Sequence, residues 1–161
     1  MDEFRNQLDL VWLAGFFDGE GCISLMENRG YVRGEVSLSQ KDPMPLHRVL
    51  HIAHEQGWPR PYVGYAKGGV KIKWYDTHGC KPLESLLPYL CPRNSERAGI
   101  YLRAFLPDSH QRSRTGIPTQ MMVARKKALK QHELVMSAHR YLDSRSSWTS
   151  LKDEVDMLWR K

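Results

Sequence analysis

The sequence predicts an α+β fold in which helices cover one face of an antiparallel sheet and leave the other face free. Two segments show period-two alternation with turn residues in the middle, and apolar segments of helical length precede, separate and follow them. At 161 residues the chain is long enough for one domain with its own core. We therefore expect a single domain over 1–161, with the core in about 7–106 and a helical extension over about 118–161.

The first element is a helix over about residues 7–18 that is apolar on nearly all sides. Such a helix must be covered on more than one face. It ends in Asp18 and Glu20, which stand between glycines. A helix C-terminus already carries partial negative charge, so two acids there indicate that a positive partner is missing.

A first hairpin follows. Ile23 and Leu25 alternate with polar positions, "NRG" at 28–30 supplies a turn, and the return strand continues to about Ser39. Its core face is predicted to carry Val32, Val36 and Leu38. The opposite face then carries a long row of polar and hydrogen-bonding side chains.

Asp42 and Pro43 predict the start of a helix that runs to about residue 56 and is closed by Gly57. A second hairpin is then predicted from "VGYAK" and "VKIKWY", joined by Gly68-Gly69. Its inward residues are Val70, Ile72 and Trp74, and the alternate positions make an aromatic and basic outer face: Tyr65, Lys67, Lys71, Lys73 and Tyr75.

Helices are predicted over 82–90, 95–106 and 119–141, with a polar, basic loop at 107–118. A last amphipathic helix has Trp148, Leu151, Val155 and Leu158 at helical spacing. In the 119–141 helix, "ARKKALK" is interpreted as a solvated face rather than a second DNA site.

Composition limits the classes of function and partner that the sequence is compatible with. The chain has 24 Lys and Arg against 18 Asp and Glu, a net charge of +6, which favours a polyanionic partner. The three cysteines are far apart and predict neither a disulfide framework nor a cysteine zinc site. Without a signal-like or membrane-spanning segment, we expect a soluble intracellular protein with no membrane partner, in the cytoplasm or an organelle.

The stretch "LAGFFDGEG", residues 13–21, resembles the signature of the LAGLIDADG homing endonucleases, and the αββαββα order is also that of the family. The resemblance implies an antiparallel sheet that binds double-stranded DNA as a saddle, and site-specific hydrolysis of both strands of a long, near-palindromic target. Because the chain has one motif, it implies a homodimer. The implied interface residues lie in the motif helix: Leu13, Ala14, Gly15, Phe17 and Asp18.

The resemblance also implies a site. Glu20 corresponds to a ligand of a divalent metal, Mg²⁺ being the expected ion, with the carbonyl of Gly19 as second ligand and Asp18 as a packing and capping residue. Gln40 resembles the residue that positions active-site water. Arg93 matches the basic active-site residue, although one way of counting selects Asn94 instead.

The DNA-binding residues expected on the outer sheet face are Ser24, Met26, Asn28, Tyr31, Arg33, Glu35, Ser37, Tyr65, Lys67, Lys71 and Lys73. Alternatively, the lysines of the outer sheet face are ordinary solvated residues that bind no DNA. For His47, His51 and His54, a solvated stripe on a helix is favoured over a set of metal ligands. The second functional hypothesis is a non-cleaving nucleic-acid binder on the same fold, an intron maturase or a transcriptional regulator, with intron RNA as a further partner. An intron, intein or free-standing origin is left open.

Overall fold

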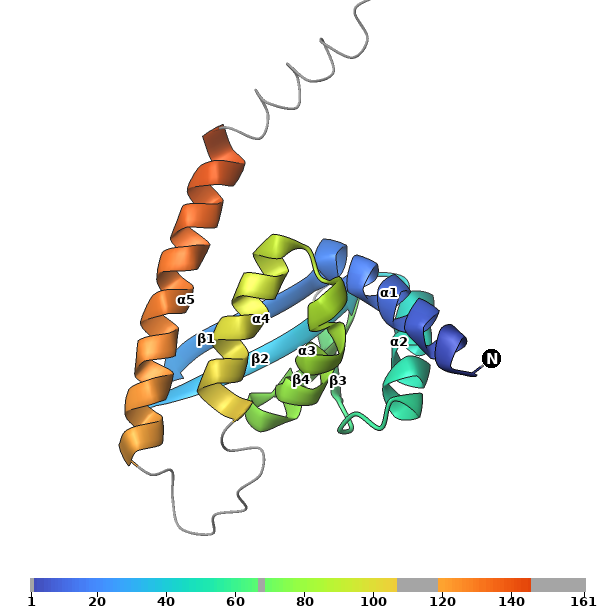
Figure 1. The fold of residues 1–161 in the computed structure, drawn as a ribbon, viewed down its shortest axis with the longest axis horizontal. Helices are drawn as coiled ribbons and strands as arrows, with labels where there is room; N and C mark the ends of the chain where they lie inside the picture. Colours follow the sequence, from blue (N-terminus) through green and yellow to red (C-terminus); the bar gives the residue numbers. More distant parts are fainter. Residues whose placement is uncertain (1, 67–68, 107–118, 146–161) are drawn as a thin grey trace, which may run out of the picture.

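The computed structural model describes residues 2–66, 69–106 and 119–145, and Figure 1 shows a sheet with helices stacked against one of its faces. The strands are β1 (Gly21–Asn28), β2 (Tyr31–Gln40), β3 (Tyr62–Ala66) and β4 (Gly69–Tyr75), in the order β1-β2-β4-β3 with every pair antiparallel. The helices are α1 (Asp2–Glu20), α2 (Met44–Glu55), α3 (Cys80–Leu86), α4 (Pro92–Phe105) and α5 (Thr119–Arg145). The predicted α+β class is confirmed.

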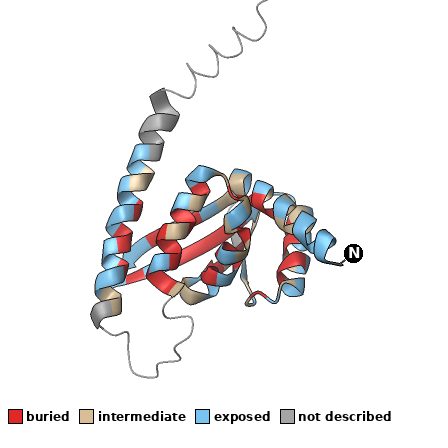
Figure 2. Ribbon diagram, in the orientation of Figure 1, coloured by how far each residue is buried: buried red, intermediate tan, exposed pale blue. Residues whose placement is uncertain are grey.

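The core lies between the sheet and the helices, where Figure 2 shows the buried residues concentrated. Of the predicted inward residues of the first hairpin and of β4, Val70 is half-buried and the others are buried: Ile23, Leu25, Val32, Val36, Leu38, Ile72 and Trp74. β2 departs from simple alternation, because Glu35 and Ser37, which were expected on the outer face, are 9% and 1% exposed. In the described residues, no helix has a stretch both long and apolar enough to cross a membrane.

The second hairpin corrects one sequence prediction. Ala66 pairs with Gly69 and Tyr65 with Val70, so Gly69 belongs to β4 and the connection is 67–68, one residue earlier than predicted. Tyr65 therefore pairs with Val70, which was predicted as an inward residue of β4. The register does not support the outward position that the sequence analysis expected for Tyr65. Lys67 lies outside the described residues.

Two prolines set the helix boundaries differently from the predictions. Pro88 interrupts the helix expected at 82–90, which becomes α3 followed by a 3₁₀ turn over Leu87–Tyr89. α4 begins at Pro92 rather than 95, because proline is accepted in the first turn, where its missing N–H would have no helical partner. The 107–118 loop and the amphipathic helix around Trp148 lie outside the described residues.

α2 begins at Met44, one to two residues later than expected, and the Asp42 carboxylate accepts the Met44 N–H at 2.9 Å. The acid thus satisfies one of the first-turn donors, as its position before Pro43 suggested.

Asp76 joins the sheet to α4 beyond the end of β4. Its carboxylate accepts the backbone N–H of Gly34 and a guanidinium N–H of Arg33, both at 2.9 Å, and its carbonyl accepts the Tyr101 hydroxyl at 2.7 Å. A Cβ on Gly34 would lie 2.5 Å from the Tyr101 ring, so only glycine allows α4 to approach β2 this closely. This packing fixes the far end of the first hairpin.

α5 braces the first hairpin along its length, lying beside β1 and α4 (Figure 1). Near its start, Arg125 is 5% exposed, donates to the carbonyl of Ala104 and lies 4.5 Å from the centre of the Phe105 ring. Two turns later, the His132 Nε2 lies 3.2 Å from the carbonyl oxygen of Ile23. Burial lowers the pKa of His132, so the neutral ring donates to an edge-strand carbonyl.

Candidate active site and nucleic-acid interface

The outer face of β1, β2 and β4 carries rows of side chains set by the register. Ser24 lies opposite Glu35, which lies opposite Tyr75, and Ser37 lies opposite Lys73. Met26 pairs with Arg33 and Asn28 with Tyr31, towards the end of the hairpin. Apart from Tyr65 and Lys67, the predicted DNA-binding residues thus share one face: Ser24, Met26, Asn28, Tyr31, Arg33, Glu35, Ser37, Lys71 and Lys73.

A carboxylate lies between two lysines at the centre of this face. The Nζ atoms of Lys71 and Lys73 lie 2.9 and 3.0 Å from the two oxygens of Glu35, which is only 9% exposed. Burial on its own raises the pKa of Glu35, but the hydrogen bonds from both lysines outweigh it and leave that pKa below its usual value. We call these three residues the central cluster; its net charge is +1, from two cations and one anion.

Three of the five residues predicted to form the dimer interface do not lie on the exposed side of α1. Leu13, Ala14 and Phe17 are completely or almost completely buried within this chain, so their side chains belong to its core. The exposed apolar positions of the helix are instead Phe4, Leu8 and Val11, at 68, 53 and 47% exposure.

Gly15 continues this exposed stripe at helical spacing, and Gly19 follows one turn later. A Cβ at either glycine would meet nothing within 4 Å in this chain, so packing within the subunit does not require glycine there. The stripe of Phe4, Leu8, Val11, Gly15 and Gly19 is an apolar, small-residue face without a cover in the described residues. The apolar positions alone do not distinguish this face from the buried one, and only Gly15 and Gly19 mark it in the sequence.

Asp18 has its partners at the start of α4. One carboxylate oxygen accepts the Cys91 N–H at 2.8 Å and the other accepts the Asn94 side-chain amide at 2.7 Å. The N-terminus of α4 carries partial positive charge, which compensates this acid. One of the two unexplained acids therefore needs no metal, and the expected packing and capping role of Asp18 is directed at α4.

Glu20 is different. It is exposed, and it makes no ion pair with any residue in the described part of the chain. The Asp18 contacts bring the start of α4, with exposed Arg93, to the end of α1 that carries Glu20. Gln40 is the last residue of β2, two positions past Leu38, which pairs with Gly21. Three element ends thus bring Glu20, Gln40 and Arg93 to one region, whereas Asn94 is buried and bonded to Asp18.

Metal ligands are sparse in one copy of the chain. Over residues 2–66, 69–106 and 119–145, no group of three or more His, Cys, Asp or Glu side chains could hold an ion. His47, His51 and His54 are exposed, and His51 lies 3.2 Å from Glu55 on the same helix. The histidine stripe is thus a solvated face, as favoured from the sequence, and any metal site around Glu20 requires oxygen donors from elsewhere.

No family model and no curated protein matches the chain. Solved structures do match. Homing endonuclease I-CvuI in complex with its target, in the presence of calcium, has a TM-score of 0.61 and 23% identity, covering 82% of this chain and 84% of that one. The chain has the LAGLIDADG homing-endonuclease fold. Homing endonuclease I-TnaI matches with a TM-score of 0.55 and 16% identity, over 83% of this chain and 97% of that one.

The LAGLIDADG meganuclease I-AabMI, bound to uncleaved DNA, matches with a TM-score of 0.51 and 19% identity, over 60% of this chain and 36% of that one. In the homing-endonuclease fold of this chain, the stretch 13–21 forms the second half of α1 and the first residue of β1. The αββαββα order expected from the sequence is also present, the last helix being divided into α3 and α4.

Proposed function

We propose that the chain is a LAGLIDADG homing endonuclease that hydrolyses both strands of a long, near-palindromic DNA target as a metal-dependent homodimer. The observation that carries this proposal is the position of Glu20. This exposed carboxylate lies where the uncovered stripe of α1 ends and the outer sheet face begins. A dimer formed through the stripe would place a carboxylate from each copy between two DNA-binding faces.

The homodimer is supported by the α1 stripe. Its apolar residues are exposed and its glycines leave room for another backbone to approach. A two-fold axis through such a face pairs each residue with its own counterpart, which gives a closed dimer and explains why one motif per chain suffices. The purified protein should accordingly sediment as a dimer, and a stable monomer at micromolar concentration would contradict the proposal.

A divalent cation, with Mg²⁺ expected, fits the donors that the dimer would bring together. Glu20 of each copy offers a carboxylate and Gly19 a carbonyl near a helix end, and such oxygen ligands suit Mg²⁺ and Ca²⁺. When bound, the ion would supply activated water and charge stabilisation for phosphodiester hydrolysis. Structures of I-CvuI with DNA in the presence of calcium or magnesium agree with this choice of ion for a protein of this fold.

The chain's own residues have distinct parts in this proposal. Glu20 holds negative charge at the helix end, and like charges from two copies would repel without a cation. The Gln40 amide can both donate to and accept from a water molecule, which suits it to orient the nucleophile. The Arg93 guanidinium can hold a phosphate oxygen through charge-assisted hydrogen bonds.

Double-stranded DNA is the proposed partner of the outer sheet face. A twisted antiparallel ribbon fits the major groove, where alternate side chains meet base edges and phosphates. In the central cluster, the lysines offer donors to guanine or to phosphate, and Glu35 offers an acceptor to the cytosine amino group. The cluster therefore presents both signs of charge to the bases.

Glu20→Gln tests the proposal, because it keeps the side-chain volume and removes the charge. We expect cleavage to fall by orders of magnitude while DNA binding persists, since the outer face is unchanged. Cut sites are first mapped with the wild-type protein, magnesium and a plasmid library. Cleavage and gel shift are then measured on one duplex that contains the mapped site.

The outcomes separate the two functional hypotheses. A Glu20→Gln protein that still cuts at near wild-type rate would refute the metal role of Glu20. A wild-type protein that shifts DNA or intron RNA without producing ends would be the non-cleaving binder. Glu84→Gln is the matched control, because Glu84 is an exposed acid on α3, in the helical layer.

A further inference from the structure

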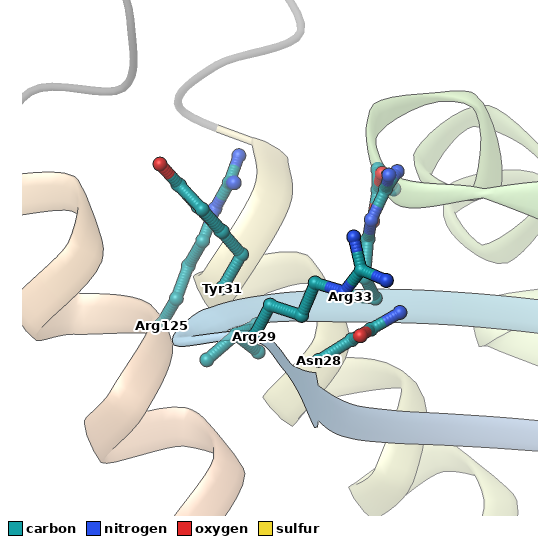
Figure 3. Close-up of a pocket in the computed structure, with 7 residues that line it drawn as sticks. Asn28, Arg29, Tyr31, Arg33 and Arg125 are labelled. Carbon is teal, nitrogen blue, oxygen red and sulfur yellow. The ribbon is translucent and has the colours of Figure 1, made fainter.

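A hollow of about 570 Å³ lies at the far end of the first hairpin, away from Glu20. Besides Val32 and Asp76, it is lined by five polar or charged residues from the hairpin and α5, labelled in Figure 3: Asn28, Arg29, Tyr31, Arg33 and Arg125. We call it the arginine pocket. Figure 3 shows Arg29 and Arg33 on one side of it and Tyr31 with Arg125 on the other.

The lining is strongly positive. Three arginines and one aspartate give it a charge of +2, counted as three minus one. Asp76 is bonded to Arg33 at 2.9 Å, and Arg29 has no ion-pair partner among the residues that the structure describes. Guanidinium groups, a tyrosine hydroxyl and an asparagine amide are the donors that hold phosphate oxygens at protein–DNA interfaces.

The arginine pocket continues the proposed DNA-binding face. A second hollow, of about 350 Å³, lies over Met26, Gly34, Glu35 and Tyr75 on the outer face, and it shares Asn28 and Arg33 with the arginine pocket. A DNA strand that follows the outer face past the central cluster would therefore reach the pocket. The pocket walls come from a turn, a strand and α5, so their spacing is fixed by tertiary packing.

We propose that the arginine pocket binds a backbone phosphate of the DNA duplex outside the bases read by the central cluster. This inference rests on the proposed function, because it needs a duplex on the outer sheet face. The phosphate fits the net positive charge, and Arg29, at the turn, is the residue most free to close on it. Arg125 is held by α5, where it contacts Ala104 and the Phe105 ring.

The position of the phosphate follows from strand length. β1 has 8 residues and runs from the Glu20 end to the pocket, a span of roughly 25 Å at about 3.3 Å per residue. With base pairs about 3.4 Å apart along a strand, the contacted phosphate lies roughly seven base pairs from the centre of the target. A duplex that ends before this point cannot fill the pocket.

Arg29→Gln tests the inference in the full-length protein. On a duplex of about 24 base pairs centred on the mapped site, we expect roughly tenfold weaker binding and a salt slope smaller by about one. On a duplex of about 12 base pairs, the variant and wild type should bind alike. Arg29→Lys should restore the slope, and Lys81→Gln, an exposed cation of α3 bonded to Gly57 in the helical layer, should change neither quantity.

Three results would overturn the inference. In the first, the Arg29→Gln protein binds the long duplex with the affinity and salt slope of the wild type. In the second, the variant loses the same amount of affinity on the long and on the short duplex. The third is a loss that depends on which base pair occupies the seventh position, because a phosphate contact weakens binding to all sequences alike.

A free phosphate is tested separately. Inorganic phosphate is titrated into the protein while the backbone amide signals of Arg29, Gly30 and Tyr31 are followed by NMR. Saturation at low millimolar phosphate without any duplex-length effect would identify a free-anion site and overturn the DNA assignment. A wild-type protein that binds no duplex of either length would instead refute the proposed function itself.

Discussion

The centre and the far end of the outer sheet face carry the same kind of charge in two different arrangements. At the centre, Lys71 and Lys73 share the buried carboxylate of Glu35, so two cations are held in fixed positions with a net charge of only +1. At the far end, three arginines and one aspartate line the arginine pocket, the aspartate pairs with Arg33, and Arg29 projects from a turn. The comparison indicates two different roles. The central cluster favours selective contacts with bases, and the arginine pocket favours general attraction to the phosphate backbone.

The largest expected effect comes from removing both lysines of the central cluster. Lys71→Ala with Lys73→Ala should weaken target binding by on the order of a hundredfold or more, because Glu35 is then left as an unpaired carboxylate facing DNA. Adding Glu35→Gln should recover part of the loss. Equilibrium titration of one target duplex with wild type, double and triple variants measures both effects. If the triple variant binds no better than the double, Glu35 does not face the DNA.

Glu35→Gln alone should have a smaller effect of opposite sign. Removing one negative charge frees the lysines for phosphates, so we expect about tenfold tighter binding to unrelated duplexes and a salt slope larger by about one. Target binding should gain less, so the ratio of specific to non-specific affinity falls. Glu84→Gln, with the same charge change in the helical layer, is the control. An unchanged ratio would show that the carboxylate contributes nothing to selectivity.

The smallest effect concerns α5, which contacts α4 through Arg125 and the β1 carbonyl of Ile23 through His132. Burial lowers the pKa of His132, so the folded protein prefers the neutral ring. The unfolded chain then binds the proton more readily, and stability falls as the pH drops below the ordinary histidine pKa of about 6.5. Above that pH, the buried neutral His132 makes its full contribution to the free energy of unfolding.

Urea unfolding of wild type and His132→Gln from about pH 8 to about pH 5 measures this loss, because the glutamine amide can still donate to the Ile23 carbonyl but does not titrate. The difference in unfolding free energy between the two proteins should shrink as the pH falls. A constant difference would exclude His132 as the titrating group.

Alternation within a strand was enough to predict most of the buried apolar residues of β1, β2 and β4, because side chains of a half-buried strand repeat every two residues. It did not predict that Glu35 and Ser37, on the opposite face of β2, are buried as well. The second hairpin was harder. Lys67-Gly68 and Gly68-Gly69 are both reasonable two-residue turns in the sequence, and they pair Tyr65 with Val70 and with Ile72 respectively. Both partners were predicted as inward residues of β4, so neither turn supports the outward position expected for Tyr65. The positions of Lys71 and Lys73 depend only on alternation within β4, and they were predicted correctly.

The residues that depend on distant contacts could not be predicted. An all-round apolar helix does not reveal which side packs inside its own chain, so Leu13, Ala14 and Phe17 were assigned to the interface although the uncovered side carries Leu8 and Val11. The arginine pocket likewise combines a hairpin with a helix about 95 residues later, and no local pattern connects them. The motif itself, with Glu20 at the end of a helix, could be recognised from nine residues.

The bond from Asp18 to the start of α4 has a consequence for synthesis on the ribosome. Its partners, Cys91 and Asn94, lie 73 and 76 positions further along the chain. The helix end that carries Glu20 therefore acquires these contacts only after residue 94 has been translated and has left the exit tunnel. A prematurely terminated chain that includes the whole first hairpin and α2 but stops before Cys91 would keep the acidic motif without the contacts that orient it. Incomplete copies of the protein should thus be inert towards chromosomal DNA.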